Sequence, residues 1–177
     1  MNQPEIRIAT LQDRALIRSI SERTWPSTYG HIISKEQIDF MLDWMYNDAS
    51  LEEQFNMGHQ FYIANLNGTD IGFCSVSEDQ EKHKNDTSIK QTKQSTFKLN
   101  KLYVLPKAQG TGSGKALLQK AIEVAKNAGA ESIYLQVNKH NNAYSFYLKN
   151  GFIKESEFKF DIGNGFFMDD YVMRLTI

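Results

Sequence analysis

Hydrophobic and polar positions alternate with two different periods along the first third of the chain. Residues 6–9, "IRIA", have the period of two that is typical of a strand. Apolar residues then recur at helical spacing in three segments, each preceded by a Ser or Thr with an acidic or amide residue three positions later. These predicted helices cover residues 11–24, 38–46 and 51–55, after Thr10, Ser34 and Ser50. "TWPSTYGHI" contains Pro26 and Gly30 and predicts a break after the first helix.

The middle of the chain has the pattern of antiparallel strands. In "FYIANLNGTDIGFCSV", residues 61–76, two β-prone runs flank Asn67-Gly68, a dipeptide favoured in tight hairpin turns. Residues 78–96 are polar and charged without periodicity, so we expect a mobile hairpin extension there. "FKLNKLYVL", residues 97–105, predicts the next strand.

The last third alternates again between the two periods. A long amphipathic helix is predicted over residues 115–128 and ends at Gly129. A strand at 132–137, a short helix at 141–150 and two closing strands around "DIGNG" follow. This order predicts an α/β fold in one domain, residues 1–177, with helices on the faces of a sheet and a central strand-helix-strand crossover.

Composition narrows the functional classes. The chain has 177 residues, a net charge of -1, 41% hydrophobic and 23% charged residues, as is ordinary for a globular protein. Without a basic excess we expect no nucleic-acid partner, and without a long apolar run we expect a cytoplasmic protein with no membrane partner. Cys74 is the single cysteine and lies in a strand-like run, so no internal disulfide forms and a buried role is expected. The four histidines lack ligand spacing, so no metal is expected.

The glycine-rich stretch "QGTGSGKALL" has the chemistry of a ligand loop. A nucleotide triphosphate loop would need glycine at Gln109 and a hydroxyl at Ala116, so both ends of that motif are missing. A dinucleotide loop needs a different spacing from that of Gly110, Gly112 and Gly114, and it follows its strand directly, whereas "PKAQ" intervenes here. A purely structural strand-to-helix turn remains an alternative.

The surroundings of this loop identify a family resemblance. Gln-x-x-Gly-x-Gly between "LYV" and an amphipathic helix resembles the acyl-coenzyme A motif of the GNAT N-acetyltransferases. "NNAYSFYLKNGF" resembles the second signature of the same family, and the two motifs stand in the family's order. The resemblance implies a mixed, mostly antiparallel sheet of about seven strands with helices on both faces, and a central β-α-β unit that binds acetyl-CoA.

The resemblance also implies site residues. Glycines permit close backbone approach, and free amides at a helix N-terminus suit a pyrophosphate. The residues it places at the cofactor are Leu102, Tyr103, Val104, Gln109, Gly110, Thr111, Gly112, Ser113, Gly114, Lys115, Asn138, Asn141 and Tyr144. For Asn138 and Asn141, capping of a loop is an equal alternative. The loop before "AYSFY" is one residue shorter than usual in the family, leaving His140 where many relatives have asparagine.

The implied reaction is direct attack of a neutral amine on the acetyl thioester. Alkylamines have a pKa of about 10.4, so a base or water chain must remove a proton first. Tyr147 matches the family's acid, which protonates the departing thiolate, although packing of its ring is the alternative. Related enzymes often carry an acid before "LYV", where this chain has Asn100. Either Asn100 holds waters that do this work, or a carboxylate or His31 arrives from elsewhere.

A weaker resemblance indicates the class of acetyl acceptor. "TWPSTYGHIISKEQIDFMLDWMY" and "GFFMDDYVM" resemble bacterial PaiA-type polyamine N-acetyltransferases. Carboxylates would suit a polyamine, and we expect Trp25, Tyr29 and His31 at the acceptor. The candidate carboxylates are Asp39, Asp43, Asp169 and Asp170, and Trp44 is a further candidate wall, although surface charge and core packing are the alternatives.

Three functions remain open at this stage. The first is acetyl transfer to a small amine such as a polyamine, and the second is transfer to a peptide or protein amine. The third is a noncatalytic CoA-binding sensor, which the missing acid at Asn100 favours. Members of the family often form homodimers, although no residue in this sequence demands one.

Overall fold

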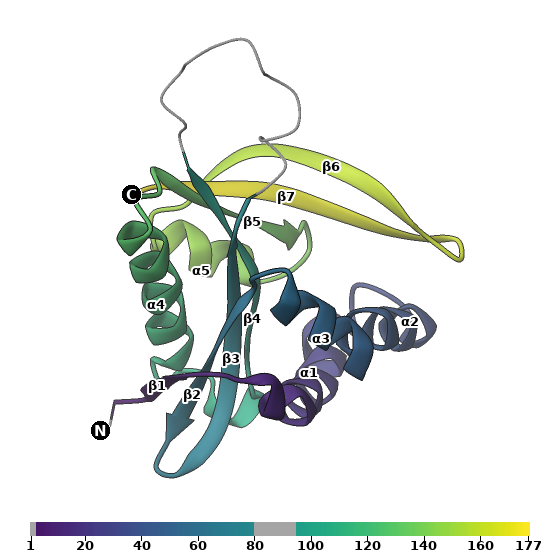
Figure 1. Ribbon diagram of the computed structural model, residues 1–177. Coiled ribbons are helices and arrows are strands. Elements are labelled where there is room, and N and C mark those ends of the chain that lie inside the picture. The colour runs from purple at the N-terminus through teal and green to yellow at the C-terminus, as the bar shows by residue number, and fades with distance from the viewer. Residues whose placement is uncertain (1–2, 80–94) are drawn as a thin grey trace.

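The protein forms one seven-stranded sheet with the strand order β1-β2-β3-β4-β5-β7-β6. The computed structural model describes residues 3–79 and 95–177 (Figure 1). Every neighbouring pair is antiparallel except β4 and β5, which are parallel and joined by a helix. The strands are β1 Glu5–Ile8, β2 Gln60–Leu66, β3 Thr69–Glu78, β4 Thr96–Val104, β5 Ser132–Asn138, β6 Ile153–Gly163 and β7 Phe166–Thr176. The predicted fold class is therefore confirmed.

Helices cover both faces of this sheet, each over its own hydrophobic core (Figure 1). One face carries α1, α2 and α3, whose apolar residues pack on Phe61 and Phe73 of the sheet. The other carries α4 and α5, which pack on the opposite side chains of β2 to β5. The helices are α1 Arg14–Tyr29, α2 Lys35–Tyr46, α3 Asp48–Asn56, α4 Ser113–Asn127 and α5 Ala143–Lys149, with short 3-10 turns η1 Leu11–Asp13 and η3 Pro106–Ala108.

The first helix differs from its prediction at both ends. Thr10 and Asp13 form the expected capping box, but it opens the 3-10 turn η1, and α1 begins at Arg14. The break expected within "TWPSTYGHI" comes at Gly30 and not at Pro26, because α1 continues through Pro26 to Tyr29. Proline forfeits the hydrogen bond of one missing N–H. Here its ring is exposed, and its neighbour Trp25 is 2% exposed in the core, so packing outweighs that loss.

The sheet opens in its middle, between β4 and β5. These strands pair only from Thr96–Leu99 to Ser132–Leu135. The register between β3 and β4 also shifts at Ser75/Val76, which leaves Asn100 as the extra residue of a β-bulge. Beyond Leu99, β5 continues to pair with β7, whereas β4 pairs only with β3. On the side that faces β5, the backbone of Asn100 to Val104 is therefore not paired with another strand.

The strands on either side of residues 80–94 reach further toward that segment than expected. The strand β3 extends to Glu78 and β4 begins at Thr96, so the ends of the expected 78–96 extension belong to the sheet. The remainder of that extension, residues 80–94, lies outside the described residues.

Candidate functional site

The glycine loop, residues 109–112, connects the 3-10 turn η3 after β4 to the start of α4. Gly110 and Gly112 have φ values of +81° and +86°, a region where residues with a side chain are strained. A Cβ at either position would meet no atom within 4 Å, so the loop borders open space. Gly112 precedes α4 without any side-chain cap, which leaves the first amides of this helix available to an anion.

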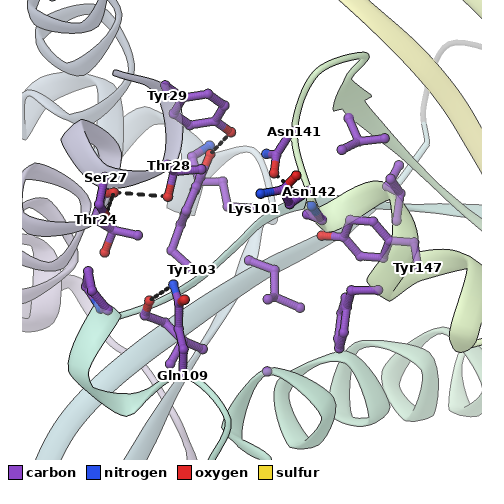
Figure 2. A pocket seen from close by; sticks show the side chains of 18 of the residues that line it. Thr24, Ser27, Thr28, Tyr29, Lys101, Tyr103, Gln109, Asn141, Asn142 and Tyr147 are labelled. Carbon is purple, nitrogen blue, oxygen red and sulfur yellow. Dashed lines mark hydrogen bonds between the residues drawn. The ribbon is translucent and has the colours of Figure 1, made fainter. Parts of the chain in front are cut away.

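A first cavity of about 570 Å³ extends from this loop along the open edge of β4 (Figure 2). Its walls are the glycine loop, the β4 edge from Leu99 to Val104, the end of β5, the start of α5 and the last turn of α1. The unpaired backbone edge of β4 and the glycine loop therefore border it, and Phe146 is among its apolar lining residues. This combination suits a long ligand with an anionic end.

Tyr147 of α5 stands on one side of the first cavity, with its hydroxyl directed into it (Figure 2). Its side chain is 7% exposed, and burial raises the pKa of its phenol. The hydroxyl therefore keeps its proton at neutral pH and can donate it. Across the cavity, the hydroxyl groups of Tyr29 and Tyr103 are joined by a hydrogen bond of 3.1 Å.

A second cavity of about 400 Å³ lies on the α1 and α2 side of the opening. It shares six lining residues with the first cavity, so the two spaces meet at the β-bulge. The shared residues are Tyr29, Leu99, Asn100, Lys101, Tyr103 and Gln136. Its other walls are mainly aromatic and thioether side chains, among them Trp25, Met41, Phe158, Phe160 and Met168.

The hairpin of β6 and β7 encloses the second cavity on its outer side. The Gln37 amide of α2 donates a 2.8 Å hydrogen bond to the Phe167 carbonyl of β7. The rings of Phe40 and Phe166 also pack, with centroids 5.5 Å apart. These contacts join α2 to the hairpin and leave a bounded chamber between them.

Among the described residues, the charged side chains that line this chamber are Lys98, Lys101 and Asp170. Lys101 donates a 2.6 Å hydrogen bond to the side-chain oxygen of Gln54, and burial lowers its pKa to about 8. Asp170 is 4% exposed, and burial together with the neighbouring Asp169 raises the pKa of its carboxyl to about 6. Both shifts favour the neutral forms of groups held away from water.

The structure brings most of the residues predicted at the cofactor to the first cavity. They are Leu102, Tyr103, Val104, Gln109, Gly110, Gly112, Gly114, Lys115 and Asn141. The Asn141 side chain also accepts a hydrogen bond from the amide of Ala143, so it caps the loop as well.

Four of the residues predicted at the cofactor do not line the first cavity. The hydroxyl groups of Thr111 and Ser113 are joined by a hydrogen bond of 2.7 Å where the loop meets α4, and neither residue lines either of the two cavities. Asn138 accepts a hydrogen bond from the amide of His140 and lines only the second cavity. The ring of Tyr144 packs on Tyr171, with centroids 5.2 Å apart, and lines neither cavity.

The residues predicted for catalysis and for the acceptor divide between the cavities. Asn100 lines both and donates a 3.0 Å hydrogen bond to the Ser77 hydroxyl. Trp25 lines the second cavity, Tyr29 lines both, and His31 lines only the first, away from the expected acceptor side.

Only one of the four candidate carboxylates reaches the second cavity. Asp39 and Asp43 border a separate groove of the α1 and α2 surface, where Asp39 pairs with Lys35. Asp169 pairs with Lys139 at 2.8 Å, and Asp170 alone lines the chamber. Trp44 also lines it, with 48% of its surface exposed.

Sequence reasoning missed the hydroxyl groups of α1 and the two lysines of β4. Thr24, Ser27 and Thr28 line the first cavity because α1 continues through Pro26, where a break was expected. Lys98 and Lys101 resemble ordinary alternating strand positions in "FKLNKLYV". The departure from this alternation is the β-bulge, which a single sequence does not reveal.

Two further findings concern the described part of the chain. Within residues 3–79 and 95–177, no group of three or more His, Cys, Asp or Glu side chains could hold a metal ion. None of the helices in these ranges is both long and apolar enough to span a bilayer.

Comparison with known proteins places this geometry in a family. A sequence profile of the Acetyltransferase (GNAT) family matches residues 16–152. A spermidine N(1)-acetyltransferase from Thermoplasma acidophilum is 28% identical over 154 residues, which cover 84% of this chain and 87% of that protein.

Two solved structures have the same fold. The PaiA N-acetyltransferase of Thermoplasma acidophilum, in complex with coenzyme A, matches with a TM-score of 0.78 at 24% identity, covering 99% of this chain and 100% of that one. A GNAT protein from Rhodopseudomonas palustris matches with a TM-score of 0.78 at 21% identity, covering 100% and 98%. The family and the fold implied by the two sequence motifs are thus confirmed, and this chain belongs to the GNAT family of N-acetyltransferases.

Proposed function

We propose that this protein transfers an acetyl group from acetyl-CoA to the primary amine of a small molecule by direct attack. The meeting of the two cavities at the β-bulge is the observation that carries this proposal. A donor bound along the β4 edge and an acceptor bound in the chamber would present their reacting groups to each other there. No covalent enzyme intermediate is then required.

The first cavity fits acetyl-CoA at both of its ends. The amides of the glycine loop and of the first turn of α4 would hold the pyrophosphate. The open β4 edge beyond Leu99 would pair with the amides of the pantetheine arm, as an added strand would. When bound there, acetyl-CoA supplies the acetyl thioester, and the thiolate that departs needs a proton. The buried Tyr147 hydroxyl in this cavity would supply it.

The size and walls of the second cavity favour a small-molecule acceptor over a protein acceptor. Its volume of about 400 Å³ lies in the range of small-molecule sites, and the contacts of α2 with β7 restrict its outer side. The similar Thermoplasma protein is named for spermidine, which supports a polyamine. A single carboxylate among aromatic walls equally suits an amine with an apolar body.

The experiment is thiol release from acetyl-CoA across a panel of spermidine, putrescine, phenethylamine, kanamycin and short peptides. We expect turnover with at least one small amine and little with peptides. Tyr147→Phe should lower kcat about 100-fold, since it removes the proton donor, with CoA binding retained. Tyr62→Phe, which removes a hydroxyl outside both cavities, should match the parent. Tight CoA binding without turnover on any amine would refute the proposed enzyme activity and would favour a noncatalytic CoA-binding sensor.

A further inference from the structure

The proposed reaction requires a base that removes a proton from the acceptor ammonium. The expected position for a base is occupied by Asn100, whose amide cannot accept a proton at neutral pH. Among the described residues that line the two cavities, Asp170 is the only aspartate or glutamate. The one histidine of this lining, His31, is an exposed residue of the first cavity and lines no part of the acceptor chamber.

Asp170 is presented to the chamber by the register of β7. It stands opposite Asn138 of β5 on one side and Phe158 of β6 on the other, and both of these residues line the same chamber. Neighbouring residues of a strand point to opposite faces. Asp169 accordingly has a different environment, in which its carboxylate pairs with Lys139 at 2.8 Å.

The carboxylate of Asp170 is buried in the wall of the chamber. It is 4% exposed, and the charges that act on it are those of Asp169, Lys98 and Lys139. Burying a carboxylate in this way is costly, so such groups are usually paired unless a ligand or a reaction uses them. An acceptor ammonium bound in the chamber would offer this carboxylate a proton to accept.

We infer that the Asp170 carboxylate is the base that removes the proton from the acceptor ammonium. This inference rests on the proposed acetyltransferase function. The ammonium gives one proton to Asp170, and the nitrogen lone pair then forms the C–N bond to the acetyl carbon. The C–S bond breaks with its electron pair on sulfur, which takes a proton from Tyr147. The new amide nitrogen loses its extra proton, which restores Tyr147 through water, and Asp170 releases its proton to solvent.

The surroundings of Asp170 suit this role. Its charged and titratable neighbours are Tyr29 of α1, Lys98 and Lys101 of β4, Lys139 after β5 and Asp169 of β7, while β6 contributes Phe158. Burial and Asp169 raise the pKa of Asp170, and the positive charges of Lys98 and Lys139 oppose that rise. The balance, a pKa of about 6, makes Asp170 a stronger base than an exposed aspartate, yet leaves it ionised at neutral pH.

The test compares the parent with Asp170→Asn, Asp170→Glu and the control Glu157→Gln, using the fastest amine of the panel above. Glu157 is a carboxylate on β6 that lines neither cavity. Steady-state kinetics from pH 5 to 9 give kcat and KM separately, and calorimetry with coenzyme A checks that each variant folds and binds the donor.

We expect Asp170→Asn to lower kcat at least about 100-fold, with KM for the amine changed by less than about threefold. The acidic limb of the parent's pH profile, with its midpoint near 6, should be absent from the residual activity. Asp170→Glu, which keeps a carboxylate, should retain a higher kcat than Asp170→Asn. If Asp170→Asn fails to bind coenzyme A, the kcat and pH profile of Asp170→Glu test the inference instead.

Two results would overturn the inference while leaving the acetyltransferase function intact. One is an Asp170→Asn variant with the parent's kcat and pH profile. The other is a loss confined to KM, because a carboxylate that only anchors the ammonium affects binding and not the proton transfer. A parent protein inactive on every amine would instead refute the proposed function, and this inference with it.

Discussion

Replacing Asp170 by asparagine should stabilise the folded protein while it impairs the proposed reaction. In the folded chain the pKa of this carboxyl is about 6, whereas its ordinary value is 3.8. The folded state therefore binds a proton more tightly than the unfolded state does. Below pH 3.8 both states are protonated and the group has no net effect on the free energy of unfolding. As the pH rises from 3.8 to 6 the folded protein progressively loses stability relative to that reference, and above pH 7 the loss is complete.

The size of this effect follows from the shift in pKa. A difference of about 2 units corresponds to about 3 kcal/mol of destabilisation once both states are ionised, above pH 7. Asparagine has nearly the same shape and no charge, so it removes this penalty. At pH 7.5 the variant should gain up to about 3 kcal/mol, or about 6–12 °C in Tm for a domain of this size. The gain should shrink through pH 5 and vanish near pH 4.

Urea or thermal unfolding of both proteins between pH 4 and 8 measures this difference. Glu157→Gln is the matched control, because a hydrogen bond with Lys154 lowers the pKa of Glu157, so its replacement should not stabilise the protein at pH 7.5. An Asp170→Asn variant that is less stable than the parent at pH 7.5, or whose gain is equal at pH 4 and pH 8, would refute the burial argument. It would mean that the carboxylate is hydrated or paired in solution.

Two further predictions concern the glycine loop and Lys101. Gly112→Ala and Gly58→Ala, both at φ +86° with open space around the new Cβ, should each cost about 1 kcal/mol in unfolding free energy. Only Gly112→Ala should weaken coenzyme A binding by calorimetry, about tenfold, and equal affinities would exclude the loop from the cofactor site. Competitive labelling with acetic anhydride should titrate Lys101 with a midpoint near pH 8, because burial disfavours its charged form. Lys35, whose pKa is raised by Asp39, should titrate above its ordinary value, and coincident midpoints would contradict the buried position of Lys101.

Local pattern was sufficient to determine the order of the elements. Alternation and capping signals lie within a few residues of each other, so the hairpin at Asn67-Gly68 and the start of α2 after Ser34 follow from sequence alone. The glycine loop belongs to the same class, since the positive φ of Gly110 and Gly112 is a local property. Together with "AYSFYLKNGF" it was enough to identify the family.

Where the pattern failed, a contact distant in sequence prevailed over a local preference. Pro26 ends a helix by its own chemistry, but the burial of Trp25 against the rings of Tyr46 and Tyr103 holds α1 intact to Tyr29. The hydroxyl groups of this last turn thereby reach the first cavity.

The chemistry of the site was decided in the same way. "DD" in "GFFMDDYVM" shows that the two aspartates face opposite sides of a strand, but not which of them enters the chamber. That depends on the register of β7 against Asn138 and Phe158, which are 32 and 12 residues away in sequence. The space itself exists because β4 and β5 part after Leu99. The sequence by itself thus determined the elements and the family, whereas only the packing of distant strands decided which carboxylate lines the chamber, because a cavity belongs to no single segment.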